Sequence, residues 1–114
     1  EGKKIVKIIR SFLKIKCQLS KLDNKLVDFA KKNNLKKNIF KQFKSIQNLK
    51  KLNQEVKFIT NFGRDIEYYT GIVFEIFSGK KEFARGGRYD DLLKSLGAKK
   101  KIPAVGAAIN LNNI

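Results

Sequence analysis

The chain has 114 residues, 42% of them hydrophobic, and a formal net charge of +16, which suits a globular domain and argues against disorder throughout. Its one cysteine excludes an internal disulfide and, with no histidine present, argues against a structural zinc site. No run of eighteen apolar residues and no signal peptide are visible, so we expect no membrane partner. The single cysteine fits a cytoplasmic protein. We also expect no metal and no cofactor.

Two parts of the chain differ in composition. Residues 1–57 hold 17 basic and four acidic residues with one glycine, whereas residues 58–114 hold nine and six, with seven glycines and the only proline. We predict a helical segment over 1–57 and a sheet-forming segment over 58–114. Because the chain begins at Glu1 instead of Met and ends in an unfinished pattern, we expect a fragment that is incomplete at both ends.

Three amphipathic helices are predicted in the first part. Apolar residues recur there at helical spacing with lysines between them: Ile5, Ile8, Ile9, Phe12 and Leu13; then Leu22, Leu26 and Phe29; then Leu35, Ile39, Phe43, Ile46 and Leu49. Cys17 is interpreted as a core residue of the first helix.

The positive charge has two interpretations. Clustered basic residues can neutralise phosphates, so a nucleic-acid surface is one hypothesis. However, 22 of the 26 basic residues are lysines and asparagine and isoleucine are also abundant, which is typical of a compositional bias. Base-specific and bidentate phosphate recognition prefers arginine, and the basic part contains only Arg10. The bias is the simpler interpretation, and the nucleic-acid alternative stays open.

The second part predicts strands separated by turns. Strands are expected over Val56–Phe62, Glu67–Phe77, Glu82–Arg85 and Ile102–Ile109, with a hairpin turn at residues 78–81 and a short helix over Tyr89–Leu96 that Gly97 ends. Gly106, inside the last strand, is expected to let another group approach closely. The order of elements predicts an α+β fold with an antiparallel sheet and flanking helices.

Two segments carry a pattern suited to a small zwitterion. Residues 64–71 combine a cation, two carboxylates and two phenols, and residues 85–90 place two arginines around a glycine pair before a phenol and a carboxylate. A guanidinium can hold an α-carboxylate in a bidentate pair, while carboxylates and phenols can accept an ammonium or imidazole N–H. Ordinary salt bridges with tyrosines in the core explain the same residues equally well.

The wording of these segments resembles a known family. The stretch RDIEYYTGIVFE resembles the first histidine-specific motif of histidyl-tRNA synthetases, ARGGRYDDLLKSLG resembles the second, and IPAVGAAINL resembles the start of the third class II motif. The resemblance implies that residues 58–114 are the C-terminal part of a class II synthetase-like catalytic core. It implies a histidine-binding site formed by Arg64, Glu67, Tyr68, Tyr69, Gly86, Gly87, Arg88 and Tyr89.

One departure from the synthetases changes the expected function. Their third motif continues to an arginine that holds ATP, whereas this chain has Asn113 at that position, and an amide cannot replace a guanidinium beside a triphosphate. The sequence therefore looks closer to the regulatory subunits of ATP phosphoribosyltransferase. That resemblance implies a subunit with no catalytic residue of its own. It would assemble with a catalytic subunit in the first step of histidine biosynthesis and take part in feedback control by histidine.

Two alternatives remain. The chain could belong to a divergent histidyl-tRNA synthetase that attaches histidine to its tRNA, a partner expected only under this alternative. It could also be a synthetase-like module that binds no ligand.

Overall fold

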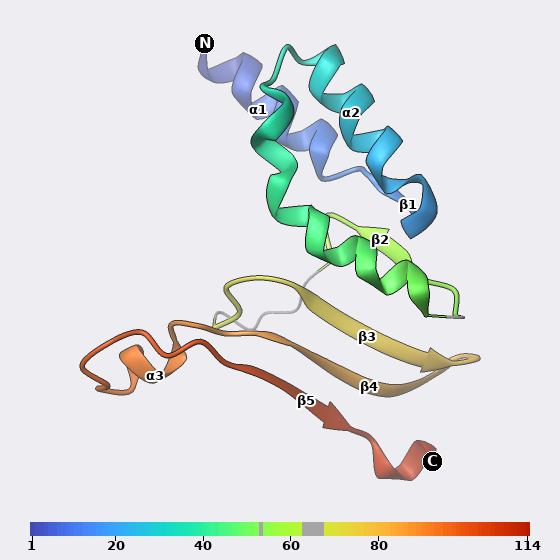
Figure 1. Ribbon diagram of the computed structural model, residues 1–114, viewed down its shortest axis with the longest axis vertical. Coiled ribbons are helices and arrows are strands. Elements are labelled where there is room, and N and C mark those ends of the chain that lie inside the picture. Colours follow the sequence, from blue (N-terminus) through green and yellow to red (C-terminus); the bar gives the residue numbers. More distant parts are fainter. Residues whose placement is uncertain (53, 63–67) are drawn as a thin grey trace. The chain divides into compact units, whose positions relative to one another are not determined.

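The computed structural model describes residues 1–52, 54–62 and 68–114, and the chain divides into two compact units, Glu1–Asn61 and Phe62–Ile114 (Figure 1). In chain order, the first unit contains α1 (Gly2–Phe12), β1 (Lys16–Gln18), the 3-10 turn η1 (Leu19–Lys21), α2 (Leu22–Lys32), the 3-10 helix η2 (Lys37–Lys51) and β2 (Lys57–Ile59). The three predicted helical segments are confirmed. The third is a 3-10 helix with a kink at Phe40.

A buried aliphatic cluster holds the first unit together. Leu22 and Leu26 lie one turn apart on α2, so both face inward, and they pack with Leu19 of η1 and Ile46 of η2. Phenylalanine rings extend this core: Phe12 stacks on Phe40 at 5.6 Å, and the rings of Phe29, Phe43 and Phe58 continue the contact. The apolar stripe of α2 therefore serves packing, as predicted. The stripe of α1 is only partly used, because Phe12 packs against the cluster whereas Ile5, Ile9 and Leu13 are exposed.

A short sheet in the first unit was not predicted. β1 pairs antiparallel with β2, with Cys17 opposite Phe58. Cys17 thus lies on a strand and not on the first helix, because α1 ends at Phe12. The hydroxyl of Thr60 donates to the carbonyl oxygens of Phe12, at 2.7 Å, and Ile15, at 3.1 Å, which ties β2 to the end of α1. The strand predicted over Val56–Phe62 corresponds to β2, which is shorter than predicted and pairs with β1.

The second unit is a three-stranded antiparallel sheet with the order β3-β4-β5 (Figure 1). Its strands are β3 (Val73–Ser78), β4 (Lys81–Arg88) and β5 (Val105–Ile109), and α3 (Leu92–Ser95) lies between the last two in sequence, with the 3-10 turn η3 (Leu111–Asn113) at the end. The predicted hairpin is confirmed, and its turn contains Gly79 at a φ of 60°, which suits glycine. The α+β class with an antiparallel sheet is confirmed.

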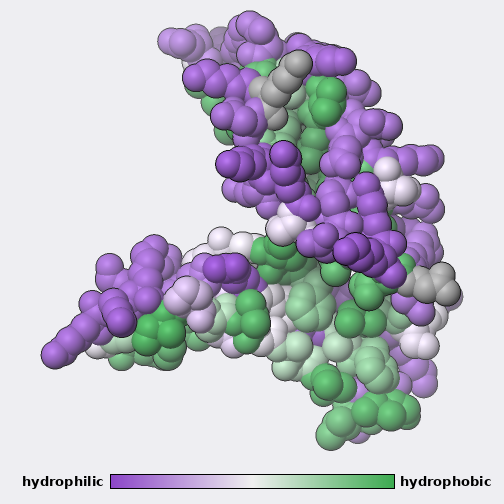
Figure 2. All heavy atoms as spheres, in the orientation of Figure 1, coloured by the Kyte–Doolittle hydropathy of each residue, from purple (hydrophilic) through white to green (hydrophobic). Residues whose placement is uncertain are grey.

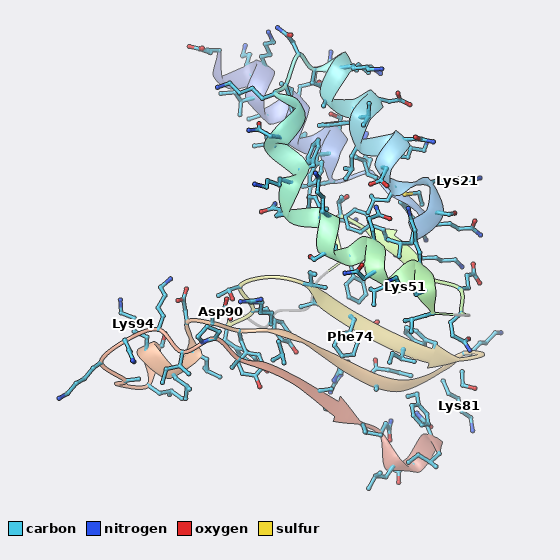
Figure 3. All side chains as sticks on the ribbon, viewed as in Figure 1. Lys21, Lys51, Phe74, Lys81, Asp90 and Lys94 are labelled. Carbon is cyan, nitrogen blue, oxygen red and sulfur yellow. The ribbon has the colours of Figure 1, made fainter. Side chains whose placement is uncertain are left out.

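Several boundaries in the second unit differ from the prediction. β4 ends at Arg88 instead of Arg85, and β5 begins at Val105 instead of Ile102. β3 begins at Val73, and α3 begins at Leu92 instead of Tyr89. Polar bonds hold the turn before α3 in place: the backbone N–H of Asp90 donates to the Thr70 hydroxyl at 2.9 Å, and the Asp90 carboxylate accepts from the N–H of Ala104 at 3.3 Å. Figure 3 shows Asp90 at this point, between β4 and α3.

The surfaces of the two units differ in polarity. On the face drawn in Figure 2, hydrophilic side chains cover most of the first unit, whereas apolar side chains gather over parts of the second. Within the described ranges, no helix has the length and apolar character needed to cross a membrane.

Candidate functional site

Strand pairing places the glycines and arginines of the second motif on defined sides of the sheet. In register, Val73 lies opposite Gly87 and Gly87 lies opposite Gly106, so these three positions face the same side. Because side chains alternate along a strand, Glu75 and Arg85, which are also paired, share that side, whereas Gly86 and Arg88 face the other. We call the first side the tyrosine face, because Tyr69 and Tyr89 lie over it.

The three tyrosines of the chain form one cluster on this face. The ring centroids of Tyr68 and Tyr69 are 4.9 Å apart, those of Tyr68 and Tyr89 are 5.5 Å apart at an interplanar angle of 90°, and those of Tyr69 and Tyr89 are 6.3 Å apart. Such offset and edge-to-face arrangements are favourable for aromatic rings. Two motifs that are 20 residues apart in sequence are therefore joined into a single patch that presents three phenol groups.

Two glycines make room for the rings. A Cβ atom on Gly87 would lie 2.7 Å from Cε1 of Tyr69, and one on Gly106 would overlap the hydroxyl oxygen of Tyr89. The expectation that a group approaches closely at Gly106 is confirmed, and that group is the Tyr89 phenol. The facing pair Gly87 and Gly106 thus forms a floor without side chains, on which both tyrosines rest.

The surroundings of Tyr69 favour its neutral phenol. Burial raises the pKa of Tyr69 above its usual 10.0, and a hydrogen bond with the Tyr68 side chain and the charge that Tyr68 and Tyr89 can carry raise it further, while the Arg85 guanidinium opposes the shift. At neutral pH the Tyr69 phenol therefore retains its proton and can both donate and accept hydrogen bonds. Arg85 adds a fixed cation to this face.

A small hollow lies beside the cluster. Its volume of about 20 Å³ suits one water molecule, and it is lined by Phe62, Tyr69, Val73, Phe74, Glu75, Arg85 and Gly86. The chemical composition of the wall fits a zwitterion: a guanidinium for a carboxylate, a carboxylate for an ammonium or imidazole N–H, and rings for an aromatic group. An amino acid needs more space, so a ligand would enter only with movement of these side chains.

Of the remaining predicted site residues, Gly86 also lines the small hollow, whereas Arg88 does not. Arg88 points away from the tyrosines and pairs with Asp90 at 2.8 Å, as in the salt-bridge alternative. A Cβ on Gly86 would lie 2.8 Å from the Phe74 ring, which places Gly86 on the side opposite the tyrosines. Figure 3 shows Phe74 on β3 of this sheet. Arg64 and Glu67 lie outside the described residues.

Arg85 was not predicted as a site residue, although it shares the tyrosine face. Its side chain is partly exposed and lies 3.5 Å from Glu82, and it acts on the Tyr69 phenol. A signal was present in the sequence, because strand alternation from Gly87 places residue 85 on the same side and residue 88 on the other. The predicted strand ended at Arg85, whereas β4 continues to Arg88, so the alternation could not be followed through Gly86–Arg88.

Asn113 has a structural partner. Its side-chain amide donates to the carbonyl oxygen of Glu82 at 2.6 Å, and the backbone N–H of Asn110 donates to the carbonyl oxygen of Phe83 at 2.9 Å. These bonds fasten η3 to the start of β4. The Asn113 amide is therefore used within the fold.

A second hollow lies along the outer side of α1. Its lining includes four cations that follow one helical stripe, Lys3, Lys7, Arg10 and Lys14, together with the apolar Val6. All of its lining residues belong to α1 and the residues that follow it, so it is an open helix surface and not an enclosed site. Among the described residues, no group of three or more acidic, cysteine or histidine side chains is placed to hold a metal.

Comparison with known proteins assigns the family. The sequence model described as "Histidyl-tRNA synthetase" matches residues 2–114. The chain belongs to the histidyl-tRNA synthetase family. The match extends through both units, so the helical residues 1–57 are part of the family pattern as well.

Individual members of the histidyl-tRNA synthetase family are similar to the chain at different levels. The ATP phosphoribosyltransferase regulatory subunit of Agrobacterium fabrum is 36% identical over 114 aligned positions. The match covers 94% of this chain and 30% of that protein. The regulatory subunit of Mesorhizobium japonicum is 48% identical over 63 residues, 54% of this chain and 17% of that protein. The histidine–tRNA ligase of Methanococcus vannielii is 40% identical over 104 residues, 84% of this chain and 22% of that protein.

The chain spans less than a third of the length of these relatives. The predicted resemblance to both groups of proteins is confirmed.

Proposed function

We propose that this chain is part of a regulatory subunit of ATP phosphoribosyltransferase and that its tyrosine face binds histidine. The observation that carries the proposal is the similarity to proteins of that name across nearly the whole chain, 36% over 114 residues in one relative. Asn113 supports it, because its amide is bonded to the Glu82 carbonyl and carries no charge for a triphosphate.

Histidine would act as a signal in this protein. The tyrosine cluster can enclose an imidazole by ring contacts, Arg85 can pair with the α-carboxylate, and the phenols can exchange hydrogen bonds with the ring nitrogens. Binding would move the side chains around the small hollow, because its 20 Å³ cannot hold an amino acid. A change of this kind can couple the site to a catalytic partner in the cytoplasm through a difference in binding free energy.

Reconstitution tests the proposal. The purified protein is mixed with the ATP phosphoribosyltransferase catalytic subunit of the same organism, and formation of phosphoribosyl-ATP is measured with and without L-histidine. We expect the protein to raise the activity of the catalytic subunit and histidine to lower it again. A catalytic subunit whose rate is unchanged by the protein would contradict the regulatory assignment.

A second candidate function is supported by a separate observation. The Methanococcus vannielii protein, 40% identical over 84% of the chain, is named a histidine–tRNA ligase. Aminoacylation separates the two: the purified protein is incubated with ATP, histidine and tRNA, and charged tRNA is measured. Under the regulatory proposal no charging occurs, and charging without any partner would establish the ligase.

A further inference from the structure

We propose that Gly106 is a positioning residue for Tyr89: the absence of a side chain at this position on β5 allows the Tyr89 phenol to join the tyrosine cluster. The inference rests on the proposed function only in its consequence for histidine affinity. The packing itself is a property of the second unit.

The contact at Gly106 involves a single side chain. If a Cβ atom were present there, its three nearest heavy atoms would all belong to Tyr89, namely the hydroxyl oxygen, Cζ at 3.2 Å and Cε1 at 3.3 Å. Gly87 is less selective, since a Cβ there would also lie 2.9 Å from the carbonyl oxygen of Ile72. At Gly86 a Cβ would collide with the backbone oxygen of Gly106. Among these three sheet glycines, Gly106 is the one whose space is occupied by Tyr89.

Tyr89 cannot avoid an added methyl group by a simple shift of its backbone. Its N–H donates to the carbonyl oxygen of Ala104 at 2.9 Å, and the preceding residue, Arg88, is paired with Val105 across the strands. The ring would therefore have to rotate, and the Tyr68 ring lies against it, with 5.5 Å between the ring centroids. A methyl group at Gly106 would thus displace the Tyr89 ring, and this displacement would move the other rings of the cluster.

A double-mutant cycle tests this inference. Gly106→Ala, Tyr89→Phe and the combined variant are compared with the unchanged protein, and Gly71→Ala is the matched control, because a Cβ at Gly71 meets only the Arg88 side chain at an ordinary 3.4 Å. Tyr89→Phe removes the hydroxyl that occupies the space of the methyl group. If Gly106→Ala has little further effect in the Tyr89→Phe background, its effect comes from the contact with this hydroxyl and not from general damage to β5.

The first readout needs no ligand. The chain has three tyrosines and no tryptophan, so its near-ultraviolet circular dichroism reports chiefly on this cluster. We expect Gly106→Ala to change the tyrosine band and Gly71→Ala to leave it unchanged. The combined variant should match Tyr89→Phe. An unchanged band in Gly106→Ala would overturn the inference.

The second readout is the affinity for L-histidine, measured by calorimetry. Gly106→Ala is expected to weaken binding about tenfold in the unchanged background and less than twofold in the Tyr89→Phe background. An equal loss in both backgrounds would overturn the inference, because Gly106 would then act independently of the hydroxyl. If the unchanged protein binds no histidine, the proposed function fails, and the dichroism cycle alone decides whether Gly106 positions Tyr89.

Discussion

The two units use aromatic residues in opposite ways. The first unit places five phenylalanines around buried leucines, and its rings are in contact from Phe12 to Phe58. The second unit holds all three tyrosines, which lie partly exposed over two glycines. A phenyl ring offers only packing, whereas a phenol also offers a polar group at its edge. The difference indicates that the first unit is built for a core and the second for a surface that can meet a polar ligand.

The largest expected effect is on the core of the first unit. Leu22 is fully buried, so Leu22→Ala should lower the free energy of unfolding by about 2–5 kcal/mol through lost burial and the cavity that remains. Val27 on the same helix is 49% exposed, and Val27→Ala should cost about 0.5 kcal/mol or less. Urea denaturation followed by far-ultraviolet circular dichroism measures both. Equal effects would show that the Leu19–Leu22–Leu26 cluster does not hold the unit together.

The next effect concerns the two arginines of the second motif. Arg85 shares the tyrosine face, so Arg85→Ala should weaken L-histidine binding about tenfold or more, the effect of losing a charge-assisted bond. Arg88 faces the other side and pairs with Asp90, so Arg88→Ala should change the affinity less than twofold. Calorimetric titration compares them. A larger loss for Arg88 would support the sequence-based prediction that Arg88 belongs to the histidine site, and would argue against Arg85.

A smaller effect is expected in the titration of Tyr69. Its pKa is raised by burial and by Tyr68, so the folded state holds this proton more tightly than the unfolded state. The associated stability is present below pH 10, the ordinary value, and is lost as the pH rises through the raised pKa. Tyr68→Phe removes the hydrogen bond and the neighbouring charge, and should lower the pKa of Tyr69.

Ultraviolet absorbance of the phenolate measures this titration. Tyr69→Phe identifies which transition belongs to Tyr69. A Tyr69 transition that stays at the same pH in Tyr68→Phe would show that Tyr68 does not contribute to the shift.

The smallest effect is expected at the surface of the first unit. Asp23, in the first turn of α2, accepts from the Gln47 amide at 2.7 Å and lies 3.4 Å from the Lys50 ammonium. Because these groups are exposed, Asp23→Ala should cost about 1 kcal/mol or less, and added salt should reduce the difference. Urea denaturation at low and high salt measures this. A cost comparable to that of Leu22→Ala would place part of the first unit's stability in its polar surface.

Much of the fold follows from local patterns in the sequence. The stripe through Leu22 and Leu26 predicted a helix, and the turn residues before Lys81 predicted the hairpin, because both depend on neighbours within a few positions. β1 escaped prediction, since Lys16–Gln18 is short and becomes a strand only when β2, about 40 residues later, pairs with it. α3 begins later than expected because Thr70 and Ala104, both distant in sequence, bind Asp90.

The sequence by itself determined the family, the α+β class and the residue types of the candidate site, because the two motifs carry their chemistry in consecutive positions. Only the tertiary structure decided which of those residues meet. Strand register placed Arg85 with the tyrosines and Arg88 with Asp90, and it placed Gly106 beneath Tyr89. A strand alternates its side chains between two sides. Because β4 continues three residues beyond its predicted limit, both arginines lie on it and face opposite sides of the sheet.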